Sequence, residues 1–251
     1  MSQSLERGNE ALLLLSSRKS LGVTELAELL SINKSSAFRI FESFKKYNLI
    51  EQDSFTAKYR LAPAILKLSE QVYKNFNIIA ISRPFMIKLV EEINESAHLC
   101  KLSNDNAVII EQIMVNSRLV VNARIGNEEP LHCSSVGKCL LAFTNVLLKE
   151  SILSRITYQK FTDNTILNKK DLQKELLAIE EKGYAFDDGE LSEEIKCIAA
   201  PIFNHLGEAI YSLGISVPTT RMTGDKLQGI ATKTIQCARL ISSRLGYVSG
   251  T

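Results

Sequence analysis

Apolar side chains recur every three to four residues between Val23 and Tyr47, in two short segments separated by Ser31-Ile32-Asn33. The apolar positions of the second segment fall on a single helical face, and they are Ala37, Ile40, Phe41 and Phe44. The pattern predicts two helices joined by a three-residue turn, the first capped by Thr24 and the second by Asn33. Two helices with such a turn form a helix-turn-helix, although the same pattern also occurs in proteins that never touch DNA.

The opposite side of the second helix is polar and basic. The positive end of its dipole would lie beside the first turn, where it suits a phosphate, and Arg39 one turn later would reach base edges. Two strands, Leu49 to Asp53 and Lys58 to Leu61, predict a hairpin wing whose cations would contact backbone phosphates. The candidate DNA-binding residues are Lys34, Ser35, Ser36, Arg39, Ser43, Lys46, Lys58 and Arg60. Four cations against one carboxylate between Lys34 and Lys46 are equally compatible with a solvated helix face.

The pattern of the remaining chain alternates between helical and strand periodicity. Residues 62 to 75 predict a connecting helix with Pro63 in its first turn. Further helices are expected over Pro84 to Glu95, from near Ser135, over Lys170 to Lys182 with Gly183 as its C-cap, and over Thr223 to Leu245. Strands are expected at His98 to Leu102, Ala107 to Ile113, Leu119 to Ala123, Tyr184 to Asp187, Lys196 to Phe203 and Ala209 to Val217. Strand hairpins with helices packed on them make this part α+β rather than doubly wound.

Composition narrows the class of protein without identifying a partner. The 251 residues suit two modest domains, and 45% hydrophobic with 23% charged residues are ordinary for a folded soluble protein. There is no apolar run long enough for a bilayer and no signal-peptide pattern at the start, so we expect a cytoplasmic protein without membrane association. The net charge of +2 is too small to indicate nucleic-acid binding by the whole chain.

The cysteines and histidines give little reason to expect a metal or another cofactor. Five scattered cysteines form no CxxC pair, and the three histidines lack HxH or HxxxH spacing. In a cytosolic protein such cysteines are expected to be reduced and mostly buried.

Several stretches, in one order along nearly the whole chain, resemble the motifs of one known protein family. Two of them resemble the signatures of its effector domain, namely RIGNEEPLHCSSVGKCLLA, from Arg124, and GYAFDDGELSEEIKCIAAP, from Gly183. Four others resemble its amino-terminal part, namely ERGNEALLLL at Glu6, TELAELL at Thr24, KSSAFRIF at Lys34 and YRLAPAILKL at Tyr59. The family that these motifs resemble is the IclR family of bacterial transcription regulators.

The resemblance implies a winged helix-turn-helix over residues 1–61, a linker helix over 62–78 and a GAF/PAS-like effector-binding domain with an antiparallel sheet over 79–251. It also implies a homodimer or homotetramer on a palindromic double-stranded DNA operator, often a repressor of a catabolic operon. A small organic acid, such as a sugar acid, an aromatic acid or a keto acid, would control operator binding.

The resemblance also indicates which residues would line the effector pocket. The positions that match the family's pocket are Ser135, Val136, Asp187, Cys197, Gly214 and Ser216. Amides at a helix start, a hydroxyl and a thiol suit a carboxylate, and Asp187 would accept from a ligand hydroxyl or water. Gly214 stands where many members carry a hydroxyl, which is expected to remove a donor and open room. In the wing, Ala57 takes a usual glycine position, which is uncomfortable for a turn with positive φ.

Two other classes of function stay open at this stage. A redox-sensing DNA-binding protein would use Cys133, Cys139 or Cys197. An enzyme would need Asp187, His132 and Cys197 to meet in one pocket, although the sequence shows no motif of nucleophile, base and orienting group.

Overall fold

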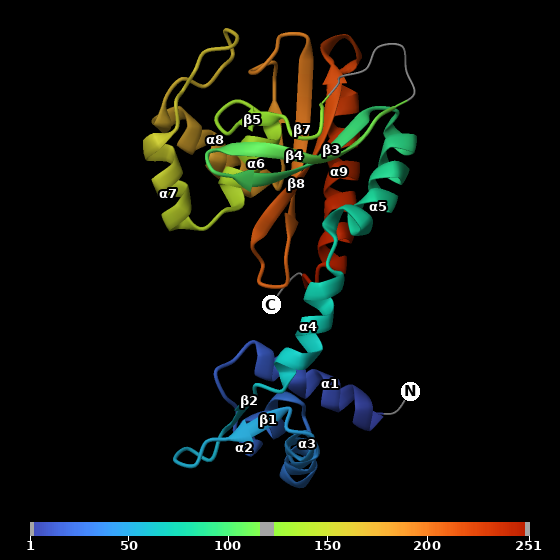
Figure 1. Cartoon of the computed structure of the whole chain (residues 1–251), viewed down its shortest axis with the longest axis vertical. Coiled ribbons are helices and arrows are strands. Elements are labelled where there is room, and N and C mark those ends of the chain that lie inside the picture. The colour runs from blue at the N-terminus through green and yellow to red at the C-terminus, as the bar shows by residue number, and fades with distance from the viewer. Residues whose placement is uncertain (1–2, 116–122, 249–251) are drawn as a thin grey trace. The chain divides into compact units, whose positions relative to one another are not determined.

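The computed structural model describes residues 3–115 and 123–248, and its internal contacts divide the chain into two compact units, Met1–Phe76 and Asn77–Thr251 (Figure 1). No helix within the described ranges is long and apolar enough to cross a membrane.

The first unit is a winged helix-turn-helix. Its elements are α1 (Gln3–Ser16), α2 (Val23–Leu29), α3 (Lys34–Lys46), β1 (Ile50–Gln52), β2 (Tyr59–Leu61) and α4 (Ile65–Asn75). Phe41 of α3 and Tyr59 of β2 are buried with ring centroids 4.4 Å apart, which anchors the recognition helix to the wing. Apolar residues of α1, α2 and β1 complete this small core.

The helix boundaries confirm one predicted cap and correct another. Asn33 caps α3 as predicted, because its side chain accepts a hydrogen bond from the Ser36 amide at 2.8 Å. The cap of α2 is Gly22 instead of Thr24, which lies inside the helix. The Glu25 carboxylate accepts the Gly22 amide at 2.7 Å, so the carboxylate half of a capping box starts this helix without a hydroxyl.

The wing and the connecting helix also differ in detail from the sequence pattern. Strands β1 and β2 pair antiparallel, with Glu51 opposite Arg60. Ala57 adopts a φ of 55°, so the left-handed turn expected at this position is present without a glycine. Pro63 precedes α4 and is not part of its first turn.

The second unit is a six-stranded antiparallel sheet between two layers of helices (Figure 1). The strand order is β5-β4-β3-β8-β7-β6. The strands are β3 (Ser96–Ser103), β4 (Asn106–Ile113), β5 (Glu128–Pro130), β6 (Ala185–Asp187), β7 (Ile195–Phe203) and β8 (Ala209–Pro218). Helices α5 (Ile78–Ile93) and α9 (Gly224–Arg244) cover one face, and a single 3-10 turn, Thr219–Arg221, precedes α9. The other face is covered by α6 (Ser135–Phe143), α7 (Val146–Arg155) and α8 (Lys169–Lys182).

The elements of the second unit agree with the prediction at some boundaries and differ at others. Helix α5 begins at Ile78, not Pro84, because Asn77 caps it by accepting from the amides of Ile79 and Ala80, so Pro84 lies within it. Gly183 ends α8 with a φ of 77°, as predicted. Part of the predicted strand Leu119 to Ala123 lies outside the described residues, and Ala123 is in no strand. Strand β5 pairs with β4 at Asn106–Val108.

Strand register brings the polar residues of the second unit together. Asp187 of β6 pairs with Cys197 of β7, which pairs with Ser216 of β8, which in turn pairs with Ser96 of β3. His98 lies two residues further along β3, opposite Gly214. Residues that lie directly opposite each other on neighbouring strands project from the same face of the sheet. These side chains therefore lie together on the face of the sheet that carries the start of α6.

A candidate DNA-binding face and a candidate effector cavity

The exposed side of α3 carries the predicted recognition residues. Lys34, Ser35, Arg39, Ser43 and Lys46 are exposed, and Ser36 is half-buried at the first turn. Arg39 has no ion pair within the described part of the chain, so its guanidinium is available to a partner. This face offers both a helix N-terminus and a forked donor one turn later, which is the chemistry of phosphate and base contacts.

The wing cations, by contrast, already face carboxylates. The Lys58 ammonium lies 2.8 Å from Glu25, and the Arg60 Nε lies 2.7 Å from Glu51. Both pairs are exposed to solvent, so each contributes little and a phosphate can compete for the cation. The wing therefore suits positioning contacts more than sequence readout.

A cavity of about 160 Å³ in the second unit gathers five of the six predicted effector residues. It is bounded by the start of α6, by the sheet and by the loop after β6. The predicted residues that line it are Ser135, Val136, Asp187, Cys197 and Ser216. It is also lined by residues that the sequence did not indicate, chiefly His98, Glu129, Ser134 and Ser192.

The start of α6 is fixed by close packing. Ser134 is the N-cap, and its hydroxyl accepts the Gly137 amide at 3.1 Å. A Cβ at Gly137 would lie 2.5 Å from the Pro130 carbonyl oxygen, so only glycine lets the helix sit this close to the preceding loop. The Ser135 hydroxyl is buried and has no partner within the described residues. The first-turn amides and this hydroxyl form a donor set for an anion.

The expectation that Gly214 opens room in the pocket is wrong. Gly214 does not line the cavity, and a Cβ there would lie 2.3 Å from Nε2 of His98 and 2.6 Å from Val136. The space is filled by the His98 imidazole, which is 4% exposed and lines the cavity. The imidazole of His98, on β3, thus packs against Gly214, on β8, which has no hydroxyl of its own.

The cavity wall opposite the α6 start is acidic. Burial raises the pKa of Glu129 to about 7 and that of Asp187 to about 6, and the charge of Asp187 adds to the shift of Glu129. Burial lowers the pKa of His98 to about 4, so its imidazole is neutral near pH 7. No lysine or arginine is found among the described residues that line the cavity.

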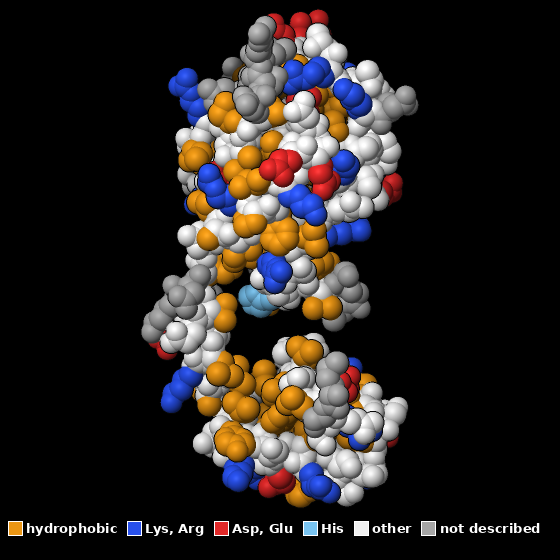
Figure 2. All heavy atoms as spheres, turned by 90° about the vertical axis from the view of Figure 1, so that its right-hand side faces the viewer, with side chains coloured by type: hydrophobic (Ala, Val, Ile, Leu, Met, Phe, Trp, Pro, Cys, Tyr) orange, Lys and Arg blue, Asp and Glu red, His pale blue; other side chains and the backbone are white. Residues whose placement is uncertain are grey.

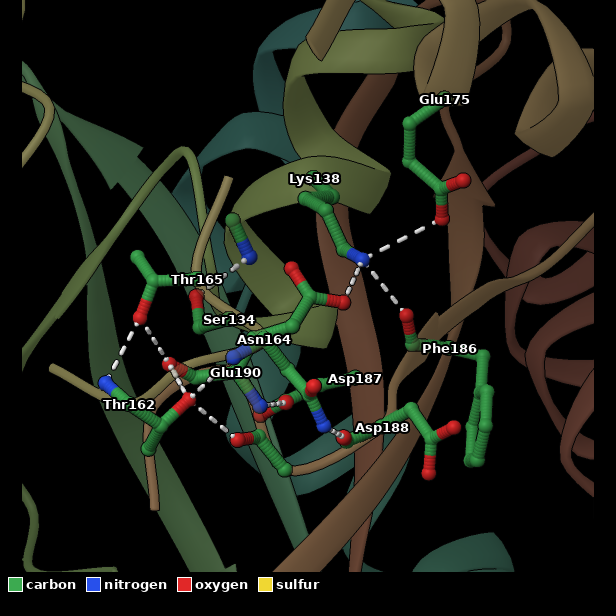
Figure 3. A network of polar contacts seen from close by, with 12 residues as sticks. Ser134, Lys138, Thr162, Asn164, Thr165, Glu175, Phe186, Asp187, Asp188 and Glu190 are labelled. Atoms are coloured by element: carbon green, nitrogen blue, oxygen red, sulfur yellow. Dashed lines mark hydrogen bonds and ion pairs between the residues drawn. The ribbon is translucent and has the colours of Figure 1, made fainter. Parts of the chain in front are cut away.

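A buried lysine ties the start of α6 to the loop after β6 (Figure 3). The Lys138 ammonium is fully buried and donates to the Phe186 carbonyl at 2.6 Å, to Glu175 of α8 at 3.2 Å and to Glu190. Burial raises the pKa of Glu190 to about 7, although Lys138 opposes the shift. Asp187 accepts the Glu190 amide at 2.6 Å, so the cavity carboxylate belongs to the same network.

Two threonines complete the attachment of that loop. The Thr162 hydroxyl donates to the Gly189 carbonyl, and the Thr165 hydroxyl donates to the Glu190 carbonyl, both at 2.7 Å. Lys138, Thr162 and Thr165 were not singled out from the sequence. The only available signal was the position of Lys138 within an otherwise apolar helix.

The cysteines have the properties of packed thiols. All five are free, and Cys197 donates to the Ser216 hydroxyl at 3.3 Å. Burial raises the pKa of Cys237 to about 12 and raises those of Cys133, Cys139 and Cys197 further. Thiols that resist ionisation react slowly with oxidants, which weighs against the redox alternative.

The residues needed for the enzymatic alternative do not meet. His132 lines a separate hollow beside Arg155 and its Nε2 lies 2.9 Å from the Gln159 carbonyl, whereas Asp187 and Cys197 line the cavity described above. Among the described residues, no group of three or more metal-ligating side chains is found.

Comparison with known proteins identifies the class of both units. Residues 4–54 match the family model described as the IclR helix-turn-helix domain, and residues 70–243 match that of the bacterial transcriptional regulator IclR C-terminal domain. The HTH-type transcriptional regulator KdgR of Escherichia coli K12 is 31% identical over 93% of this chain and 89% of its own. The transcriptional repressor IclR of the same organism is 27% identical over 97% of this chain and 90% of its own.

A solved structure supports the fold independently. The crystal structure of the Agobacterium tumefaciens repressor BlcR superimposes with a TM-score of 0.73 at 22% identity, covering 98% of each chain. The family models together span most of the sequence, and the named relatives are transcription regulators rather than enzymes. The chain belongs to the IclR family and is a DNA-binding transcriptional regulator.

Proposed function

We propose that the protein is a repressor of a catabolic operon whose operator binding is controlled by a small organic acid. Helix α3 reads the operator through Arg39, and Lys34, Ser35, Ser36, Ser43, Lys46 and the wing cations Lys58 and Arg60 contact the backbone. The acid binds in the cavity of the second unit, and α4 transmits the change as a linker between domains spanning about 1–61 and 79–251.

The observation that carries this proposal is the unpartnered Ser135 hydroxyl at the start of α6. The buried Ser135 hydroxyl lacks a partner within the described residues, and it lies beside first-turn amides in a cavity. An unpaired buried hydroxyl costs free energy, which a ligand that accepts its hydrogen bond would recover. A carboxylate is the natural ligand for such a helix start.

We infer that the protein acts as a homodimer or a homotetramer on a palindromic operator. One short helix contacts few base pairs, and two-fold symmetry doubles the contacts at fixed spacing. Hydrophobic side chains gather on one face of the DNA-binding unit (Figure 2). Helices α1 and α4 expose large apolar residues that a second copy would cover, namely Leu5, Leu13, Leu66, Leu68 and Val72.

The test is selection of duplexes by the purified full-length protein from a random library, followed by competition with small acids. We expect an enriched inverted repeat that the protein releases when the correct acid is added. Arg39→Ala should weaken that site about 10- to 100-fold and leave acid binding unchanged, because a bidentate base contact is lost. Arg244→Ala, which removes an exposed arginine from the second unit, is the matched control and should change neither. An Arg39→Ala variant that loses both activities, or neither, contradicts the proposal.

A further inference from the structure

We propose that the effector is a polyhydroxylated monocarboxylic acid, and that His98 and Glu129 recognise its hydroxyl groups. This inference rests on the proposed function, because it assigns a ligand class to the same cavity. It concerns residues that lie on two different strands, β3 and β5, and that face the start of α6.

The cavity has one end suited to an anion. The unpartnered Ser135 hydroxyl is 1% exposed and lies at the N-terminus of α6, where the helix dipole is positive. A carboxylate placed there would accept from the hydroxyl and the first-turn amides. Because Asp187 faces the same cavity, a second negative charge on the ligand would add repulsion.

The remaining wall consists of groups that pair with hydroxyls. The Glu129 and Asp187 carboxyls are acceptors when ionised, and the neutral His98 imidazole has one donor and one acceptor nitrogen. His98 has no hydrogen-bond partner within the described part of the chain, although it is buried. A ligand hydroxyl can donate and accept at once, so it would satisfy both His98 and a neighbouring carboxyl.

The same wall disfavours other classes of acid. A dicarboxylate would place its second charge against Glu129 and Asp187, and the described lining residues include no lysine or arginine to neutralise it. An alkanoic acid would leave the imidazole and the carboxyls unpaired. No phenylalanine, tyrosine or tryptophan is found in the described lining, so the wall offers no large aromatic face on which an aromatic acid would stack.

Gly214 determines where His98 stands. The two residues pair directly across β3 and β8, and a Cβ at 214 would lie 2.3 Å from His98 Nε2 and 2.7 Å from Cε1. Any other residue at 214 must displace the imidazole or Val136. The two residues therefore determine specificity together, because the glycine on β8 leaves the space that the histidine on β3 occupies.

A panel of six-carbon compounds that differ by one feature tests the ligand class. Hexonates of several configurations, including gluconate, carry one carboxylate and five hydroxyls. Glucarate has a second carboxylate in place of the terminal hydroxymethyl group, hexanoate lacks hydroxyls and sorbitol lacks a carboxylate. Binding to the full-length protein is measured by calorimetry. We expect at least one hexonate to bind tenfold or more tightly than glucarate, hexanoate and sorbitol. Equal or tighter binding of one of these three, or no binding of any hexonate, overturns the inference.

Variants test the named residues. His98→Phe keeps a flat aromatic ring, although a larger one, but loses both nitrogens, and it should weaken hexonate binding about tenfold or more, as should Gly214→Ala. His98→Gln should retain part of the affinity.

Glu129→Gln should shift the preference toward glucarate by about tenfold, whereas Glu128→Gln, its exposed neighbour, should not. Unchanged hexonate affinity in both His98→Phe and Glu129→Gln contradicts the assignment.

The experiment distinguishes failure of the proposed ligand class from failure of the proposed regulatory function. If an acid of another class releases the protein from its operator, the proposed regulation stands and the polyhydroxylated ligand is wrong. If no acid affects DNA binding although hexonates bind, the ligand class stands and the regulatory proposal is wrong.

Discussion

Glu129 lies on the short edge strand β5, yet it lines the cavity together with another carboxyl, Asp187. Its pKa of about 7 in the folded state is above the ordinary value of 4.5, chiefly because of burial. The folded protein therefore holds this proton more tightly than the unfolded chain does. The stabilisation linked to that proton is fully present below about pH 4.5 and is lost as the pH rises through about 7.

We predict that Glu129→Gln stabilises the second unit at pH 8 by roughly 1 to 3 kcal/mol and has little effect at pH 4.5. Glutamine resembles the protonated acid, so it removes the cost of a buried charge only where the charge exists. Urea unfolding at both pH values measures the difference. Glu128→Gln, at an exposed position beside it, is the control. Equal effects of Glu129→Gln at the two pH values would show that its ionisation is not linked to folding.

The residues of the cavity differ in how readily the sequence reveals them. Ser135, Asp187, Cys197 and Ser216 were predicted because the sequence resembles the IclR family at these positions. His98 and Glu129 were missed because their role depends on strand register and on a short edge strand. His98 occupies a run of β3 that is buried on both faces, so no alternation of polar and apolar residues marks it.

At the scale of elements, the buried Lys138 holds α6, α8 and the loop after β6 together. This arrangement positions two residues of the cavity, because Ser135 begins α6 and Asp187 directly precedes the loop after β6. Removing the cation would leave the Glu190 carboxylate buried with one oxygen already lacking a partner within the described residues. A buried charge without its partner is much more costly than the absence of the whole pair.

We predict that Lys138→Met destabilises the second unit by about 3 to 5 kcal/mol near pH 8. The loss should be smaller at pH 5, because Glu190, with a pKa of about 7, is then protonated. Adding Glu190→Gln to Lys138→Met should recover part of the loss at pH 8. Chemical denaturation of the two variants provides the comparison. A double variant no more stable than Lys138→Met would show that the lysine acts by packing and not by charge.

Elements with a clear period were predicted, and those without one were not. The stripe of α3 and the long helix α9 follow helical spacing, and their predicted bounds differ little from the observed ones. Helix α7 was missed because it exposes Val146 and Leu147, which blurs its apolar face. The sequence Glu-Glu-Pro of β5 has low strand propensity, and it forms a strand only because β4 offers a free edge.

At the scale of the whole molecule, the chain consists of two compact units with separate cores. A regulator needs a coupling free energy between them, and that coupling is reciprocal. If the acid lowers the affinity for DNA by some factor, DNA must lower the affinity for the acid by the same factor. The sequence indicated two units through the change of pattern after the wing, but pattern carries no information on the strength of their coupling.

We predict two thermal transitions, one for each unit, with separate responses to ligands. A hexonate at about 100 times its dissociation constant adds roughly 2.7 kcal/mol to the unit that binds it, which raises that midpoint by about 5 to 10 °C. Operator DNA should raise the other midpoint. Differential scanning calorimetry of the full-length protein distinguishes the two shifts.

The variants supply the controls for that experiment. Arg39→Ala should abolish only the shift caused by DNA, and His98→Phe only the shift caused by the hexonate, because each residue lies in one unit. With both ligands present, the two shifts should be smaller than their separate values, since each ligand opposes binding of the other. A single transition that both ligands raise equally would mean that the units unfold together. Fully additive shifts in separate transitions would mean that the acid and the DNA are not coupled, and the cavity would then have a role other than control of operator binding.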